Sequence, residues 1–225
     1  LTRASRMALS SLVEALGLAA SQMLQIDEGE LSGWWTPVMG GRPDEAQLYL
    51  YDLLPGGAGY ARAVGNDLPE VLDAAEALLG GCDCPSSCYR CIRHYGNNWI
   101  HASLDRHLAL ALLRHLRTGE LPRLTDQDKD RALVALRQLL ALRGIACDEN
   151  ANLSGTRIPL IIQQANSRVC VDVHHPLIDP LALDSPVIAA ARSQFLQAVS
   201  LDAFDLLHDL PAAVARLKLP SETVG

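Results

Sequence analysis

The chain has 225 residues, of which 49% are hydrophobic and 20% charged, so it has enough apolar material for one or two domains. Its formal net charge of −7 argues against a globally basic nucleic-acid-binding protein. No run of about 18 apolar residues is free of charge, and no secretory signal is recognised, so we expect a cytoplasmic protein with no membrane partner. The chain begins at Leu1 rather than at methionine, which indicates a piece of a longer polypeptide.

The first half of the chain predicts helices around one short strand. Apolar residues at helical spacing indicate an amphipathic helix over 7–25. Leucines and tyrosines alternate in 46–54, which predicts a strand. The glycine-rich run 55–59 then predicts a tight turn before a short helix, with a contact to DNA phosphate as the alternative. Further helices are expected at 68–79 and 104–117.

The segment 121–124 predicts a joint between two domains, at 1–119 and 120–225. Beyond it we expect a helix, two strands and more helices, at 126–143, 157–164, 168–174, 185–199, 201–209 and 211–218. The whole chain is therefore predicted to be α+β, with a helix-rich four-cysteine domain followed by a small α/β appendage.

The order helix, strand, strand, helix after the joint is typical of part of a restriction-endonuclease-like core. Asp172 would project from its second strand, but such nucleases need a second carboxylate and a lysine in the pattern E-x-K to hold Mg²⁺. Neither strand contains that pattern, since Asp172 is followed by Val173, His174 and His175. We therefore expect a degenerate, structural copy of this core, and an active nuclease would have to lose cleavage on Asp172→Ala.

Four cysteines form the pattern C-x-C-x3-C-x2-C, at Cys82, Cys84, Cys88 and Cys91. Four thiolates suit the tetrahedral coordination of structural zinc, which leaves no open position for a substrate. Turn-forming residues between the cysteines allow the loop to fold back on an ion. The alternatives are two disulfides, free thiols or an iron–sulfur cluster, although common ferredoxin spacings differ from this one.

The cysteines lie in a basic segment of an otherwise acidic chain. Residues 82–117 carry five basic and two acidic side chains and four of the seven histidines. Aromatic residues interleaved there, Tyr89, Tyr95 and Trp99, offer rings for stacking on nucleotide bases. The predicted nucleic-acid contacts are Arg90, Arg93, Arg106, Arg114 and Arg117. A solvated helix face, or a surface for an acidic partner or a motor domain, fits the same residues.

The runs YLYDLLPGGAGYARAV and CDCPSSCYRCIRHYGNNWIHASLDRHLALALL resemble the Mrf-type zinc-binding domain. This domain lies C-terminal to the motor in DEAD/DEAH-box superfamily 2 helicases and also occurs in helicase-associated phage-defence proteins. The resemblance covers roughly residues 5–117. It implies that the four cysteines bind one structural zinc ion.

The resemblance also implies a role in an ATP-dependent DNA helicase of DNA repair or phage defence. The chain would be an accessory region that holds domains together and helps to grip DNA. ATP would be used by motor domains outside this chain, joined in cis or in trans, because the chain has no Walker A motif and no DEAD/DEAH box. The alternative is a protein-interaction module of such a complex that does not itself bind DNA.

Overall fold

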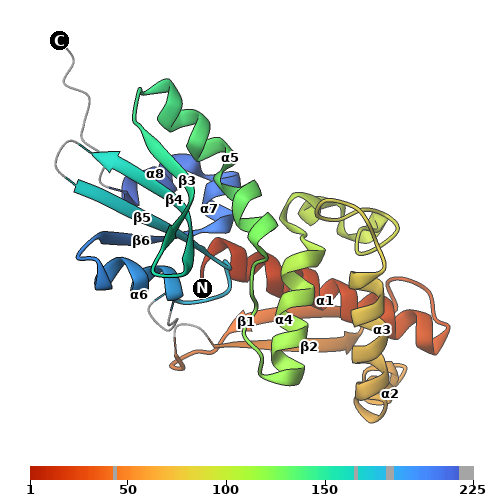
Figure 1. The fold of residues 1–225 in the computed structure, drawn as a ribbon. Helices are drawn as coiled ribbons and strands as arrows, with labels where there is room; N and C mark the ends of the chain where they lie inside the picture. Colours follow the sequence, from red (N-terminus) through yellow and green to blue (C-terminus); the bar gives the residue numbers. More distant parts are fainter. Residues whose placement is uncertain (43–44, 165–166, 181–184, 218–225) are drawn as a thin grey trace. The chain divides into compact units, whose positions relative to one another are not determined.

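The computed structural model describes residues 1–42, 45–164, 167–180 and 185–217. It divides into two compact units, Leu1–Leu121 and Pro122–Gly225. Each unit combines helices with a small β-sheet (Figure 1), which confirms the predicted α+β class.

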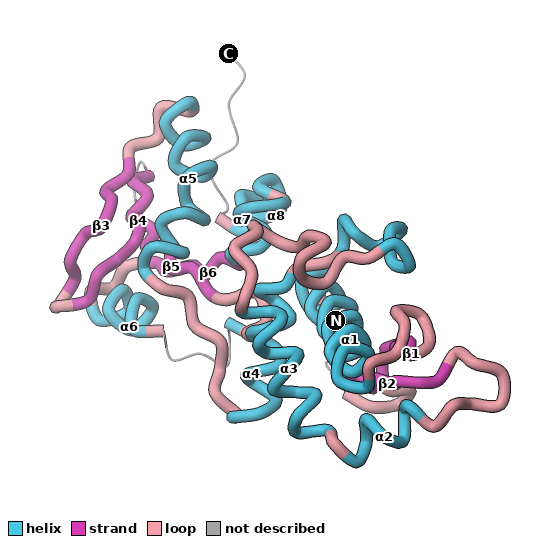
Figure 2. The backbone as a smooth tube through the Cα atoms, turned by 90° about the vertical axis from the view of Figure 1, so that its right-hand side faces the viewer, coloured by secondary structure: helices cyan, strands magenta, loops and turns pink. Residues whose placement is uncertain are grey.

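The first unit is built around one long helix. Its elements are α1 (Arg3–Leu24), β1 (Leu31–Pro37), β2 (Ala46–Asp52), α2 (Tyr60–Asn66), α3 (Leu68–Gly80), the 3₁₀ segment η1 (Tyr95–Ser103) and α4 (Arg106–Thr118). Helices α3 and α4 run beside α1, and the β1–β2 hairpin packs against it (Figures 1 and 2). The core consists mainly of small and branched apolar side chains from α1, α3, α4 and the cysteine loop.

By length and composition alone, helix α1 is long and apolar enough to cross a membrane. The sequence criterion required a run without any charge and therefore missed this helix, which contains Glu14. Of the most apolar 18-residue window of α1, 61% is buried inside the structure. A buried core helix passes the same test of length and composition, and the packing of α1 against β1, α3 and α4 is that of a core helix.

The hairpin approaches α1 closely at one glycine. A Cβ atom on Gly33 would lie 2.4 Å from Cγ1 of Val13, so any larger residue requires a shift of α1 or β1. Trp35, two positions along β1, donates its indole N–H to Oγ of Ser10 at 2.9 Å. Odd-numbered residues of β1 therefore face α1. The even-numbered Trp34 is 65% exposed.

The glycine-rich turn after β2 is organised by an acidic side chain. Gly56, Gly57 and Gly59 adopt positive φ angles, which explains the requirement for glycine. The carboxylate of Asp52 accepts hydrogen bonds from the main-chain N–H groups of Gly59 at 2.8 Å and Ala61 at 2.9 Å. The bond from Ala61 is the largest of several that lower the pKa of Asp52. The Asp52 carboxylate therefore binds main-chain N–H groups of the kind that the alternative interpretation assigned to a DNA phosphate.

The second unit is a four-stranded sheet with helices on both faces. Its elements are α5 (Asp126–Leu142), β3 (Cys147–Leu153), β4 (Thr156–Gln164), β5 (Ser167–His174), α6 (Pro186–Ser193), β6 (Gln197–Asp202), α7 (Ala203–His208) and α8 (Leu210–Arg216). The strand order is β3-β4-β5-β6, with antiparallel pairs except for the parallel pair β5–β6. Helices α5, α7 and α8 cover one face and α6 covers the other (Figure 1).

Several predicted elements differ from the structure. The helix predicted to continue to residue 199 ends at Ser193, because Phe195 turns the chain into β6 with a positive φ angle. The predicted strand at 46–54 ends at Asp52. The helix predicted over 211–218 is found as Leu210–Arg216, and residue 218 lies outside the described residues. The elements that were not predicted are β1, η1, β3 and β6.

Candidate metal centre

The cysteine loop follows directly on α3. Gly81 ends this helix, and Cys82 and Cys84 come next in a segment without helix or strand structure. The main chain then bends at Pro85 and Ser86 and turns again before Cys91, whose main-chain N–H bonds back to the carbonyl oxygen of Cys88 at 3.1 Å. The two pairs of cysteines are thereby folded against each other. Three of the four are buried, and Cys88 is partly exposed.

The four sulfur atoms lie within 4.8 Å of one another. The Sγ–Sγ distance is 3.5 Å for Cys82 and Cys88, 3.7 Å for Cys84 and Cys91, and 3.9 Å for Cys88 and Cys91. A tetrahedron with zinc–sulfur bonds of about 2.3 Å has edges of about 3.8 Å. The sulfurs therefore have the spacing that a tetrahedral thiolate site requires. All six cysteines of the chain are free, which excludes the alternative of two disulfides in this structure.

Main-chain N–H groups stabilise negative charge on the sulfurs. The N–H of Arg90 points at Sγ of Cys88 at 3.4 Å, and the N–H of Cys88 points at Sγ of Cys91 at 3.1 Å. The bond from Arg90 lowers the pKa of the Cys88 thiol to about 6, whereas burial raises the pKa of Cys84 to about 12. Because a thiolate rather than a thiol binds a metal, a cation would offset the cost of the buried charges. Among the described residues, this cluster is the one group of three or more His, Cys, Asp or Glu side chains close enough to share an ion.

Two of the arginines predicted to contact nucleic acid, Arg93 and Arg106, make hydrogen bonds to the cysteine loop. Arg106 is buried, and its guanidinium donates to the carbonyl oxygens of Leu79 and Cys84, both at 3.0 Å. Arg93 is partly buried and donates from Nε to Oγ of Ser87 at 2.9 Å. These bonds hold the start of α4 and the end of α3 against the loop, a role that the sequence pattern did not reveal.

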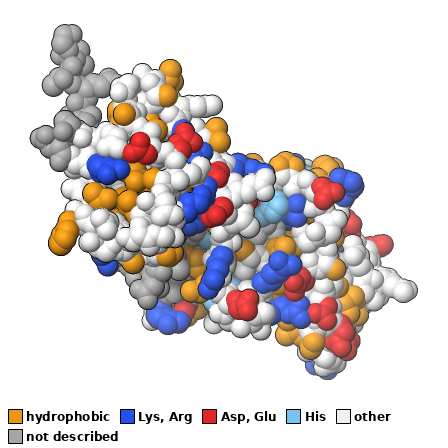
Figure 3. Space-filling view, in the orientation of Figure 1, with side chains coloured by type: hydrophobic (Ala, Val, Ile, Leu, Met, Phe, Trp, Pro, Cys, Tyr) orange, Lys and Arg blue, Asp and Glu red, His pale blue; other side chains and the backbone are white. Residues whose placement is uncertain are grey.

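The arginines near the end of α4 form ion pairs with α3. Nε of Arg114 lies 2.9 Å from Glu76, and Nη1 of Arg117 lies 2.7 Å from the same carboxylate. Arg117 also pairs with Asp73. The hydrogen bond from Arg114 is the first cause of a lowered pKa at Glu76. On the face seen in Figure 3, basic and acidic side chains are interspersed rather than gathered into one basic area.

Arg90 is exposed beside the cluster, and it has aromatic neighbours along the chain. Tyr89, Tyr95 and Trp99 are 70%, 87% and 76% exposed. The Tyr89 ring packs edge-on against the imidazole of His101, with ring centroids 5.4 Å apart. The rings that the sequence suggested for stacking on bases are therefore accessible to solvent. Of the five predicted arginines, Arg90 is the one with an exposed side chain next to them.

The nuclease alternative of the sequence analysis concerns the second unit. Asp172 is 5% exposed, and both its oxygens are used. Oδ1 accepts from Nζ of Lys129 at 2.9 Å and from the N–H of Val173 at 2.8 Å, while Oδ2 accepts from the Ser185 hydroxyl at 2.6 Å. In this structure both oxygens of the Asp172 carboxylate are thus bound to groups of the chain itself. The structural rather than catalytic role of this core stays a prediction.

The part of the chain that contains the cysteine cluster is similar to known proteins. The family described as the MrfA Zn-binding domain matches residues 12–92, a range that includes all four cysteines. The chain is also 37% identical over 178 residues to the Druantia protein DruE of Escherichia coli (strain UMEA 4076-1). That match covers 76% of this chain but 10% of the relative, so the chain spans about a tenth of the protein it matches. No solved structure matches the chain.

Proposed function

Since residues 12–92 match the MrfA Zn-binding domain family, we propose that the chain is a zinc-stabilised accessory region of a phage-defence DNA helicase. In this proposal Cys82, Cys84, Cys88 and Cys91 hold one structural zinc ion in the cytoplasm. The zinc centre keeps α3, the cysteine loop and α4 together. The motor domains that use ATP lie outside this chain and pack against this region.

The observation that carries the proposal is the spacing of the four sulfurs, which lie within 4.8 Å of one another. It supports a single ion because an iron–sulfur cluster places several atoms between its cysteine ligands and so separates them further. A site with four protein thiolates has no position for a substrate, so the zinc would serve the fold. The similarity to a Druantia protein supports a defence setting over DNA repair.

Metal analysis of the full chain tests the zinc proposal. We expect one zinc per chain by elemental analysis, and loss of that zinc together with a lower unfolding temperature in Cys84→Ser and Cys91→Ser. Cys170→Ser is the control, because Cys170 is also buried but lies in the second unit, away from the cysteine loop. Full zinc content in both loop variants, or iron in place of zinc, contradicts the proposal.

We propose further that this region contacts DNA through Arg90 and the exposed rings of Tyr89 and Tyr95. A triple variant of Arg90, Arg114 and Arg117 to alanine should bind single-stranded oligothymidylate more weakly, with a flatter dependence on salt. Arg106 is left unchanged, because its burial would make a loss of binding indistinguishable from a loss of structure. Glu70→Ala, a change of charge on α3, serves as the control.

The alternative function is a protein-interaction module. The ion pairs of Arg114 and Arg117 with α3 favour it, because they engage basic groups that DNA would otherwise attract. In that case the triple variant would keep the wild-type affinity for oligothymidylate. Its association with the motor region of its own system would fall instead.

A further inference from the structure

A cavity in the first unit lies away from the four sulfurs. It has a volume of about 450 Å³ and is formed by α1, β1, the end of β2 and η1. All three tryptophans of the chain line it: Trp34, Trp35 and Trp99. A volume of this size is in the range of protein ligand sites and exceeds what one or two water molecules need.

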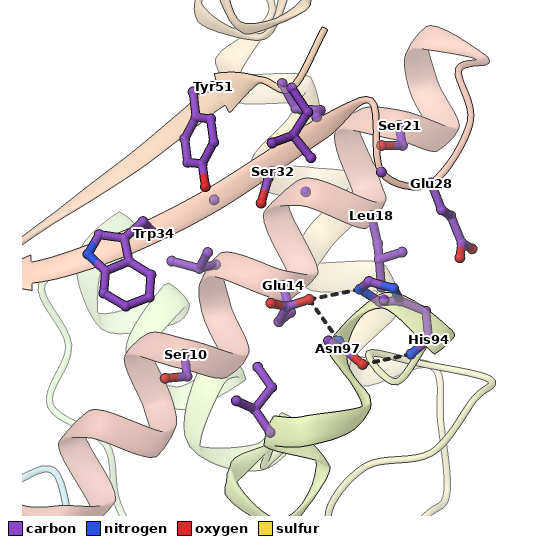
Figure 4. A pocket seen from close by; sticks show the side chains of 18 of the residues that line it. Ser10, Glu14, Leu18, Ser21, Glu28, Ser32, Trp34, Tyr51, His94 and Asn97 are labelled. Carbon is purple, nitrogen blue, oxygen red and sulfur yellow. Dashed lines mark hydrogen bonds and ion pairs between the residues drawn. The ribbon is translucent and has the colours of Figure 1, made fainter.

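Five consecutive residues of β1, Leu31 to Trp35, line the cavity, together with Tyr51 of β2. Residues from both faces of β1 line it, since Gly33 faces α1 whereas Ser32 and Trp34 are on the opposite face. Tyr51 lies directly across from Ser32 in the hairpin, and the two side chains lie side by side at the cavity (Figure 4). In the described part of the chain, β1 has β2 as its one strand neighbour. The main-chain groups of the free edge are the kind that bind an added extended segment.

The lining is acidic and aromatic. Oε2 of Glu14 accepts hydrogen bonds from Asn97 at 2.7 Å and from the ring Nε2 of His94 at 2.9 Å (Figure 4). Among the described residues, Oε1 of Glu14 has no hydrogen-bond partner. A second carboxylate, Glu28, is exposed at the rim. No lysine or arginine is present among the described residues that line the cavity.

This combination selects for a positively charged side chain. Exposed faces of Trp34 and Trp99 attract cations through the ring quadrupole. Carboxylates at the same site attract them by charge and repel phosphate. A nucleic-acid strand would bring its phosphates towards Glu14 and Glu28, so the cavity is a poor site for DNA. A peptide that contains arginine or lysine can bind to the carboxylates, the aromatic rings and the strand edge at the same time.

Gly17 keeps the cavity open on the side of α1. It lies in the interior of this helix, where glycine is less favourable than alanine. No atom lies within 4 Å of a Cβ built on Gly17, so close packing does not require glycine there. Gly33 is the contrasting case, because Val13 leaves no space for its Cβ. A large residue at position 17 would project into the cavity.

We propose that this cavity is a docking site for an extended, basic segment of a partner protein. The segment would pair with the free edge of β1 and insert an arginine or lysine side chain into the cavity that Trp34, Trp99 and Glu14 line. The site does not depend on the zinc proposal. The basic partner proposed here differs from the acidic partner that the arginines of 82–117 would fit.

The test uses the full chain and a short peptide of alternating threonine and valine with one central arginine. Matched peptides carry citrulline or glutamate at the centre. Because all three tryptophans line the cavity, intrinsic tryptophan fluorescence reports binding directly. We expect saturable binding of the arginine peptide, about tenfold weaker binding of the citrulline peptide and none of the glutamate peptide.

Gly17→Leu should abolish binding by filling the cavity, and Gly17→Ala should retain it. Glu14→Gln keeps the size of the side chain and should weaken binding of the arginine peptide without changing that of citrulline. Zinc content and circular dichroism report whether each variant is folded. If Gly17→Leu does not fold, the peptide affinities of Glu14→Gln test the proposal. The proposal is overturned by equal affinity for the three peptides, by absence of binding, or by oligothymidylate competing for the same site.

Discussion

Nε of Arg106 donates a hydrogen bond of 3.0 Å to the carbonyl oxygen of Cys84. The same guanidinium donates through Nη1 to Leu79, at the end of α3. One buried side chain at the first turn of α4 thus connects α3, the cysteine loop and α4. The cysteine loop is thus held by a link that involves no metal, and this link can be tested separately from the sulfurs.

Removing that link should destabilise the first unit. Arg106→Gln leaves two buried carbonyl oxygens without their charged donor, and we expect a loss of about 2–4 kcal/mol in the free energy of unfolding. Arg106→Lys should recover little of it, because an ammonium group lacks the planar fork that reaches both oxygens. Urea unfolding measures the change, and Arg90→Gln is the exposed control. A loss below about 0.5 kcal/mol would show that the link is not structural.

The unequal thiols predict an order of reaction in the metal-free chain. With a pKa of about 6, Cys88 is mostly thiolate at neutral pH, whereas Cys84, with a pKa of about 12, stays protonated. After chelation, iodoacetamide should modify Cys88 first, at a rate that is nearly constant above about pH 7 and falls as the pH drops through 6. Peptide mass spectrometry identifies the modified residue.

Zinc should protect all four cysteines of the loop from this reaction. Equal modification rates in the metal-free chain, with a midpoint near the ordinary thiol pKa of about 8.5, would mean that the loop unfolds without its ion.

The contact between Gly33 and Val13 predicts a steric pair. Gly33→Ala places a methyl group where Cγ1 of Val13 lies, and we expect a loss of about 1–3 kcal/mol from overpacking. The double change Gly33→Ala with Val13→Ala should be less unstable than the sum of the two single changes, because the second removes the clash. Chemical unfolding of the four proteins measures the coupling. Gly65→Ala in α2 is the control, since its Cβ meets open space.

Asp172 is buried and forms an ion pair with the partly buried Lys129 in the second unit, at 2.9 Å. Lys129→Met leaves the Asp172 carboxylate without its cation, and we expect a loss of about 2–3 kcal/mol, less than for a fully buried pair because Lys129 is partly exposed. Asp172→Asn should be less harmful, because the amide oxygen still accepts hydrogen bonds and no unpaired negative charge remains at position 172. Thermal unfolding compares the two variants. Mg²⁺-stimulated DNA cleavage by the wild type, lost in Asp172→Asn, would restore the nuclease alternative.

The short-range features of the chain were determined by the sequence itself. These features are patterns that extend over one or two turns of the chain. They are the spacing of the four cysteines, the apolar periodicity of α1, α3, α4 and α5, and the alternation in β2. Such patterns depend on neighbours along the sequence, so their structure can be predicted without knowing the fold.

The tertiary structure decided what depends on distant residues. Strands β1, β3 and β6 form because partner strands supply their hydrogen bonds, and their sequences alone do not alternate clearly. Arginines that looked like a basic surface became a buried brace in Arg106 and ion pairs in Arg114 and Arg117, because α3 brings carbonyl oxygens and carboxylates to α4. The acidic cavity arises in the same way, since Glu14 meets Asn97 only after folding brings residues more than 80 positions apart together.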